Sequence, residues 1–143
     1  PRVACMEWLD PLILAGHWMP EMVELAGGLD DLMERGGVSR RITLEELLTY
    51  GAEILILMPC GMDISRAVEE LNHMTDLKKW TTLPAVISGQ VYAVDSGSLY
   101  TRSGPRLVDG LEIMAKIIHP ELFPGDLPGT AAVRLAEFPA HST

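Results

Sequence analysis

The chain has 143 residues, enough to bury the core of one domain of ordinary size. With 48% hydrophobic and 22% charged residues, its composition excludes wholesale disorder. The formal net charge of −9 and the scattering of the 11 basic residues argue against a nucleic-acid partner, because phosphate recognition needs clustered Lys and Arg. The longest apolar run, 54–58, is far shorter than the roughly 20 residues of a membrane span.

The first thirty residues predict a strand followed by a short helix. The brief apolar run 2–6 is typical of a strand, and Asp10-Pro11 then turns the chain. Met19-Pro20-Glu21 predicts a helix start, because Pro suits the first helical position and Glu favours the positive end of the helix dipole. The helix is expected to reach about Ala26 and to end at Gly27-Gly28.

The middle of the chain carries a capped helix and a buried strand. In "RITLEELLTYG", Thr43 and Glu46 have the spacing of a capping box, and Gly51 ends a two-turn helix. The aliphatic run in "AEILILMPCG" predicts a strand that is buried on both faces. A helix over 64–72 and a weaker helical segment over 78–83 follow.

The last third is predicted to contain a short element over 85–87, a turn at 88–89 and a strand over 90–94. The longest helix covers 105–118, where apolar residues recur in helical register. Residues 122–143, rich in Pro and Gly, are expected to form an extended, peripheral tail.

Short aliphatic strands that alternate with helices predict an α/β fold, a three-layer α/β/α sandwich with a short, mostly parallel sheet. In such folds ligands bind beyond the carboxyl ends of the strands. The segments expected there are 7–18, 59–63 and 95–102.

Aromatic residues are few, so their placement in those segments is informative. Trp8, Trp18 and Tyr100 fall at this predicted edge of the sheet, whereas Trp80 in "LKKW" is assigned to packing. Apolar and aromatic surface with a few polar groups is the usual composition of a small-molecule pocket. The predicted ligand-binding wall consists of Glu7, Trp8, His17, Trp18, Tyr100 and Arg102. The alternative is that one or more of these aromatics simply covers the core.

The sequence supports a catalytic, metal or cofactor site less well than it supports the ligand-binding wall. We therefore assign none of these three kinds of site. His17 and Glu21 are four residues apart, but Pro20 places the histidine before the helix. Cys60 lies at a strand end where a thiolate can be activated, yet no histidine is near it in sequence. Two buried, unbridged thiols at Cys5 and Cys60 are therefore expected. An α/β enzyme or chelatase-like domain that acts on a tetrapyrrole or small acid through Glu7, Asp10 and His17 is the competing hypothesis.

Glu45 is a separate candidate. The capping box uses Glu46, which leaves Glu45 at the exposed second position of the helix. The helix dipole stabilises a carboxylate there by about 0.3–1 kcal/mol, and this is its simplest role. The functional alternative is an exposed acid that pairs with a partner arginine.

Three stretches in this order carry a family resemblance: "RVACMEWLDPLILAGHWMPEMVELAGG", "ITLEELLTYGAEILILMPCG" and "LPAVISGQVYAVDSGSLYTRSGPRLVDGLEIMAKIIHPE". Over residues 2–121 the chain resembles the C-terminal lobe of periplasmic binding proteins for cobalamin, iron siderophores and haem, the substrate-binding components of ABC importers. Residues 1–121 are accordingly interpreted as this lobe. The abrupt start "PRVACMEW", without Met or a signal-peptide pattern, leads us to expect a processed or excised piece.

The resemblance implies a two-lobe, extracytoplasmic protein, periplasmic or membrane-anchored as a lipoprotein, whose N-terminal lobe and linking helix are missing here. It implies ligand contacts from 7–18, from the approach to "ITLEELL" and from "SLYTR". It also implies that Glu45 docks onto arginines of the membrane permease. The pattern "EWLDP…AGHW.PE" is closest to cobalamin-type members, whereas the polar "GGVSRR" before the capped helix departs from them and keeps haem and siderophore ligands open.

Overall fold

The computed structural model describes residues 1–9, 12–15, 19–32, 40–58, 80–94, 106–123 and 132–134. The strands are β1 (Val3–Leu9), β2 (Leu12–Leu14), β3 (Arg40–Arg41), β4 (Ile54–Leu57), β5 (Val91–Val94) and β6 (Ala132–Arg134). The helices are α1 (Met19–Leu25), α2 (Leu44–Tyr50), α5 (Pro84–Ile87) and α7 (Arg106–Ile118).

All six strands belong to one sheet with the order β3-β2-β1-β4-β5-β6. The central strands β1, β4 and β5 are parallel, whereas β2 pairs with β1, β3 with β2 and β6 with β5 in antiparallel fashion. Because β3 reverses the direction of β2, it runs in the same direction as the central strands. The mixed but mostly parallel sheet confirms the predicted fold class.

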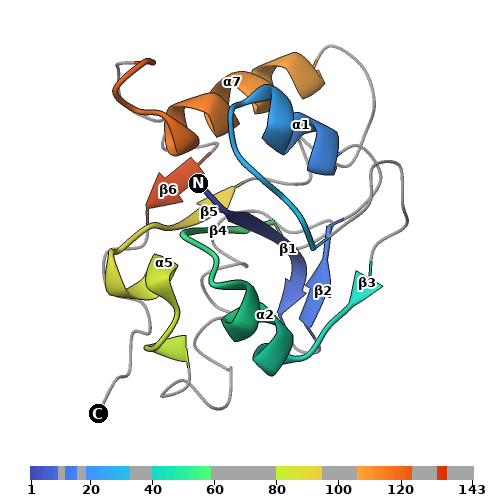
Figure 1. Cartoon of the computed structure of the whole chain (residues 1–143). Coiled ribbons are helices and arrows are strands. Elements are labelled where there is room, and N and C mark those ends of the chain that lie inside the picture. Colours follow the sequence, from blue (N-terminus) through green and yellow to red (C-terminus); the bar gives the residue numbers. More distant parts are fainter. Residues whose placement is uncertain are drawn as a thin grey trace.

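Helices cover both faces of the sheet, with α1 and α7 on one side and α2 and α5 on the other (Figure 1). Alternate residues of each strand point to opposite faces. In β4, Ile54 and Ile56 therefore join the core beneath α1 and α7, while Leu55 and Leu57 join the core beneath α2 and α5. Two buried faces explain why the strand has no polar position.

The first strand extends beyond its predicted end and forms a hairpin that was not predicted. β1 continues to Leu9, and Trp8 pairs with Ile13 and Leu9 with Leu12 of β2. Residues 7–9 and 12–14 therefore lie in strands, and the prediction of a loop is wrong for them. A three-residue strand such as β2 is too short for its hydrophobic pattern to be recognised in the sequence. In the folded protein its backbone groups form hydrogen bonds with β1.

The predicted helix ends are confirmed where local chemistry sets them. Thr43 Oγ1 accepts a hydrogen bond from the Glu46 amide at 3.1 Å, and Glu46 Oε1 accepts one from the Thr43 amide at 3.4 Å. Gly51 ends α2 in the left-handed conformation with φ +68°. The α1 helix stops before Gly27, which has φ +96°. The sequence therefore predicted both helices through their end residues.

Packing assignments for Trp80 and Cys5 are also confirmed. The Trp80 side chain is 1% exposed within the core under α2 and α5, and Cys5 is a buried, unbridged thiol on the other face. Cys60, the predicted helix 64–72 and residues 78–79 fall outside the described ranges. Within the predicted tail, β6 forms an edge strand on β5.

Candidate functional site

The candidate site lies at the edge of the sheet where the parallel strands end, called here the carboxyl edge. β1 reaches this edge at Leu9 and β4 at Leu57. Because α2 leads into β4 and ends near its beginning, the first turn of α2 lies at the same edge, next to the β1–β2 hairpin and β3 (Figure 1). The Ile42 amide donates to the Leu12 carbonyl at 3.0 Å and fixes α2 to this hairpin.

Glu7 is the member of the predicted ligand-binding wall whose side chain the structure describes. It is half-buried and lies in β1, between Met6, which pairs with Leu14, and Trp8, which pairs with Ile13. The register shifts at this point, so the regular alternation of side chains is interrupted at Glu7. Such bulges re-aim side chains and are common beside binding sites.

The other members of the wall remain predictions. For Trp8 the structure describes the backbone in β1 but not the side chain. His17, Trp18, Tyr100 and Arg102 fall outside the described ranges, as does Asp10 of the competing enzymatic hypothesis. The expected convergence of these side chains on one surface is therefore untested.

The first turn of α2 presents two neighbouring exposed glutamates, Glu45 and Glu46. Glu46 is held in place, because its carboxylate accepts from the Thr43 amide and lies 3.2 Å from the Arg40 guanidinium. Glu45 is the second residue of the helix and is exposed. This confirms the predicted division of roles in the cap and leaves Glu45 on the surface at the carboxyl edge.

Arg40 lies at the same edge of the sheet and was missed by the sequence analysis. It lies in β3, where it pairs with Leu14 of β2, and its ion pair with Glu46 connects this edge strand to the start of α2. The two side chains are 46% and 44% exposed, so solvent screens the pair and its main effect is to orient Glu46. Arg40 and Glu46 are six residues apart, and this spacing indicates an ion pair only once the strand β3 is known.

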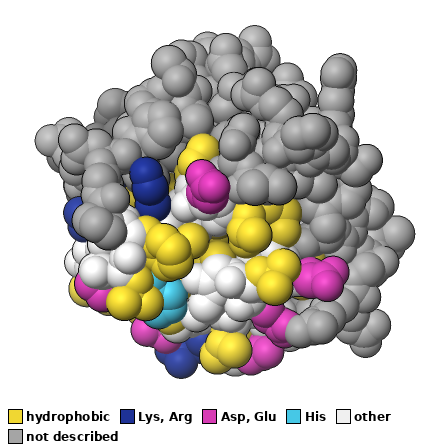
Figure 2. Space-filling view, turned by 90° about the horizontal axis from the view of Figure 1, so that it is seen from above, with side chains coloured by type: hydrophobic (Ala, Val, Ile, Leu, Met, Phe, Trp, Pro, Cys, Tyr) yellow, Lys and Arg dark blue, Asp and Glu magenta, His cyan; other side chains and the backbone are white. Residues whose placement is uncertain are grey.

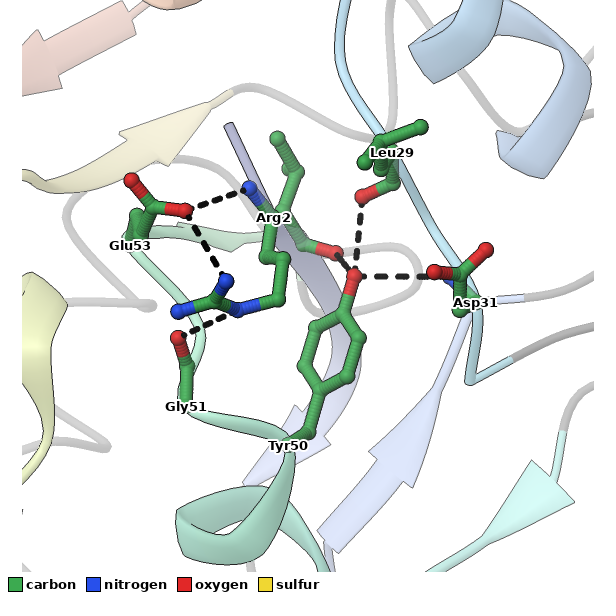
Figure 3. Close-up of polar contacts among 7 residues, drawn as sticks. Arg2, Leu29, Asp31, Tyr50, Gly51 and Glu53 are labelled. Carbon is green, nitrogen blue, oxygen red and sulfur yellow. Dashed lines mark hydrogen bonds and ion pairs between the residues drawn. The ribbon is translucent and has the colours of Figure 1, made fainter.

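The opposite, amino edge of the sheet is closed by a polar network (Figure 3). Tyr50 Oη lies 2.9 Å from the Leu29 carbonyl and accepts from the Asp31 amide at 3.4 Å. Arg2 donates from Nε to the Gly51 carbonyl at 3.1 Å and pairs with Glu53 at 3.5 Å. Every contact joins two segments of the fold, so this network is structural.

Two buried groups lie near this network. Burial, aided by the negative charge of Asp30, raises the pKa of the Cys5 thiol well above its usual value. Asp30 itself is 7% exposed. A protonated, buried thiol is a poor nucleophile, so Cys5 has a packing role.

A shallow hollow of about 460 Å³ also opens at the amino edge, between the start of β4, α5 and the end of α7. Its lining includes Glu53, Pro84, Gln90 and Ile118. The hollow lies at the opposite edge of the sheet from Glu7 and Glu45. It is therefore not part of the predicted ligand site. Among the described residues, no three His, Cys, Asp or Glu side chains are grouped as a metal site would require.

Comparisons with known proteins point to one class. No protein-family model matches the chain. A stretch of 44 residues is 48% identical to the uncharacterized ABC transporter substrate-binding lipoprotein YvrC of Bacillus subtilis (strain 168), covering 31% of this chain and 14% of that protein. None of the helices in the described ranges has the length and apolarity needed to cross a membrane.

Solved structures share the fold over most of the chain. A periplasmic heme-binding protein from Pseudomonas aeruginosa matches 94% of this chain with a TM-score of 0.70 and 20% identity. The periplasmic vitamin B12-binding protein BtuF of Vibrio cholerae matches 85% of it, with a TM-score of 0.67 and 20% identity. The chain spans 49% and 45% of these two proteins. It therefore has the fold of one lobe of periplasmic binding proteins, and these relatives are substrate-binding proteins rather than enzymes.

Proposed function

We propose that this chain is the C-terminal lobe of an extracytoplasmic substrate-binding protein that delivers a metal macrocycle or metal chelate to an ABC importer. The observation that carries the proposal is the extent of the structural match. The matches cover 85% and 94% of this chain, but 45% and 49% of the neighbours, which fits one lobe of a two-lobe protein. The stretch of 48% identity to an ABC transporter substrate-binding lipoprotein supports the same class from sequence.

The ligand surface proposed for this lobe is the carboxyl edge, formed by Glu7, Trp8, His17, Trp18, Tyr100 and Arg102. Ligands of α/β sheets bind beyond the carboxyl ends of the strands, and Glu7 lies at a register shift in β1. The aromatic side chains would cover the apolar rim of a macrocycle, while Glu7 and Arg102 bind its polar groups. We propose cobalamin as the ligand because the pattern "EWLDP…AGHW.PE" resembles cobalamin-type members most. Haem and ferric siderophores are the alternatives, since the structural neighbours include a vitamin B12-binding and a heme-binding protein.

Fluorescence titration of the intact two-lobe protein with cobalamin, haem and ferric siderophores tests this proposal. One of these ligands should quench tryptophan emission with saturation, and Trp8→Phe should weaken its binding by up to about tenfold. Trp80→Phe is the matched control, because Trp80 is 1% exposed in the core and should leave ligand affinity unchanged. Saturable quenching by none of the three ligands would contradict the proposal.

The second proposed contact is between Glu45 and an arginine of the permease. Glu45 is exposed, while Thr43 and Arg40 hold its neighbour Glu46 within the capping arrangement. A carboxylate that pairs with arginine in two parallel hydrogen bonds supplies orientation as well as affinity. Such a pair would dock this lobe onto the transporter.

Reversing the charge in the Glu45→Arg variant should weaken binding to the permease about tenfold or more, with ligand affinity retained. Glu21→Arg is the matched control. Glu21 is also an exposed carboxylate in the first turn of a seven-residue helix, but its helix, α1, covers the opposite face of the sheet from α2 (Figure 1). Both quantities can be measured with permease reconstituted in nanodiscs. Equal effects of the two substitutions would show that Glu45 has no specific docking role.

A further inference from the structure

His119 connects the ends of two helices that are distant in sequence. It follows the last residue of α7, and its imidazole lies against Gly27, just beyond the end of α1. Nε2 lies 3.1 Å from the Gly27 carbonyl oxygen, and Nδ1 lies 3.0 Å from Glu121 Oε1. A Cβ atom on Gly27 would approach the ring to 2.6 Å, so the two groups are in direct contact.

Both hydrogen-bond partners of the ring are acceptors. The Gly27 carbonyl and the Glu121 carboxylate can accept hydrogen bonds, but a neutral imidazole has only one N–H to donate. Only the doubly protonated imidazolium can donate to both at once. The observed arrangement is therefore that of a charged His119.

The surroundings of the ring also favour the charged form. The hydrogen bond to Glu121 and that to the Gly27 carbonyl raise the pKa of His119 above its ordinary value of 6.5, while partial desolvation and the amino group of Pro1 oppose them. The pKa of Glu121 is lowered, first by the hydrogen bond from its own backbone amide and then by the hydrogen bond with His119. The carboxyl ends of α1 and α7, both at this histidine, are the negative ends of their dipoles.

We propose that His119, held between the Gly27 carbonyl and the Glu121 carboxylate, is a protonation-dependent latch that fastens the end of α7 to the end of α1. Protonated, the imidazolium bonds to both segments. Deprotonation leaves a single N–H, which the charged Glu121 carboxylate holds as the stronger acceptor, so the connection to Gly27 is lost.

The latch keeps two turns well ordered: the turn that follows α7 and the turn that follows α1. Both turns meet at His119. The Leu122 and Phe123 amides donate to the His119 carbonyl at 3.0 and 3.2 Å, so the turn after α7 is built on this residue. Leu122 is 67% and Phe123 46% exposed, and Leu25 beside Gly27 is 70% exposed. Figure 2 shows hydrophobic side chains beside a histidine on this α1–α7 side of the molecule. Opening the latch would loosen the backbone that carries these apolar groups.

The direction of the pH dependence follows from the raised pKa. A histidine whose pKa is higher in the folded than in the unfolded protein stabilises the fold fully below its unfolded pKa. That stabilisation is lost as the pH rises through the folded pKa. The latch is therefore closed below the ordinary pKa of an imidazole and opens as the pH rises through the raised pKa of His119.

NMR titration of the His119 Cε1–H signal in the full chain, assigned by its loss in His119→Gln, tests the protonation step. The pKa should exceed 6.5, and Glu121→Gln should lower it. Glu112→Gln is the matched control, since it removes an exposed carboxylate from α7 outside the pair and should leave the pKa unchanged. A His119 pKa at or below 6.5, or one that Glu121→Gln does not lower, would overturn the proposal.

Amide hydrogen exchange tests the structural step. After correction for intrinsic exchange rates, the Gly27 and Phe123 amides of the natural chain should lose protection several-fold between mildly acidic and mildly alkaline solution. His119→Gln should show the low protection at both pH values, because its neutral amide does not titrate. Protection that is independent of pH in the natural chain would rule out the latch, even if the pKa is raised.

Discussion

At the residue scale, single side chains join segments that are far apart in sequence. Tyr50, the last residue of α2, places its hydroxyl between the Leu29 carbonyl at 2.9 Å, the Val3 carbonyl at 3.4 Å and the Asp31 amide at 3.4 Å. Burial raises the pKa of Tyr50 to about 12, so the hydroxyl keeps its proton at physiological pH. One phenol thus connects the end of α2 with β1 and with the segment after α1.

Tyr50→Phe is expected to destabilise the fold by about 1 kcal/mol, because the ring still fits while partly buried backbone groups lose their partner. Tyr92→Phe provides the matched control. The Tyr92 hydroxyl donates to the Gln90 side chain at 2.7 Å, two residues away, so its loss frees no distant segment and should cost less. Urea denaturation followed by circular dichroism measures both values. Equal losses would show that the Tyr50 hydroxyl does not bridge the segments in solution.

At the scale of elements, α2 depends on its two ends. The helix has seven residues, too few to be stable by propensity alone. The reciprocal Thr43–Glu46 cap satisfies the amides of the first turn. Gly51, with φ +68°, ends the helix, and Leu47 anchors one face of it in the core. This short helix carries Glu45, so the cap also determines where the proposed docking carboxylate stands.

Thr43→Ala should therefore cost about 1 kcal/mol of stability, the usual value for losing an N-cap side chain. The same substitution at Thr49, exposed in the last turn of α2, should be neutral or slightly stabilising because Ala has the higher helix propensity. Chemical denaturation of both variants gives the comparison. A loss at Thr43 no larger than that at Thr49 would contradict a capping role in solution.

At the scale of the whole molecule, the central strands connect two cores. β4 contributes Ile54 and Ile56 to the core under α1 and α7, and Leu55 and Leu57 to the core under α2 and α5. Neither layer of helices can pack without the same strand. The lobe is therefore expected to unfold as one cooperative unit.

Ile56→Ala and Leu55→Ala, both 0% exposed, should each cost about 2–5 kcal/mol and leave a single transition, with fluorescence and circular dichroism coinciding. Leu25→Ala is the surface control, since that side chain is 70% exposed, and it should change stability by less than about 0.5 kcal/mol. Two separated transitions in either core variant would mean that the faces unfold independently.

The candidate site was predictable where it depends on local chemistry. The position of Glu45 followed from the capping box, whose parts lie within four residues of one another. Arg40, which holds Glu46, escaped prediction because β3 has only two residues and no periodicity. The His119–Gly27 contact joins residues that are 92 positions apart, and no pattern in the sequence predicts it.

The sequence by itself determined the elements whose signals are local: the buried strand 54–57, the ends of α1 and α2, the long helix α7 and the alternation that specifies an α/β sandwich. Tertiary structure alone decided the rest: the β1–β2 hairpin, the edge strands β3 and β6, and the latch between two helix ends. Caps and hydrophobic runs act on neighbouring residues, so they can be read along the chain. Two- and three-residue strands and contacts between distant segments are stable only once the sheet beside them has formed.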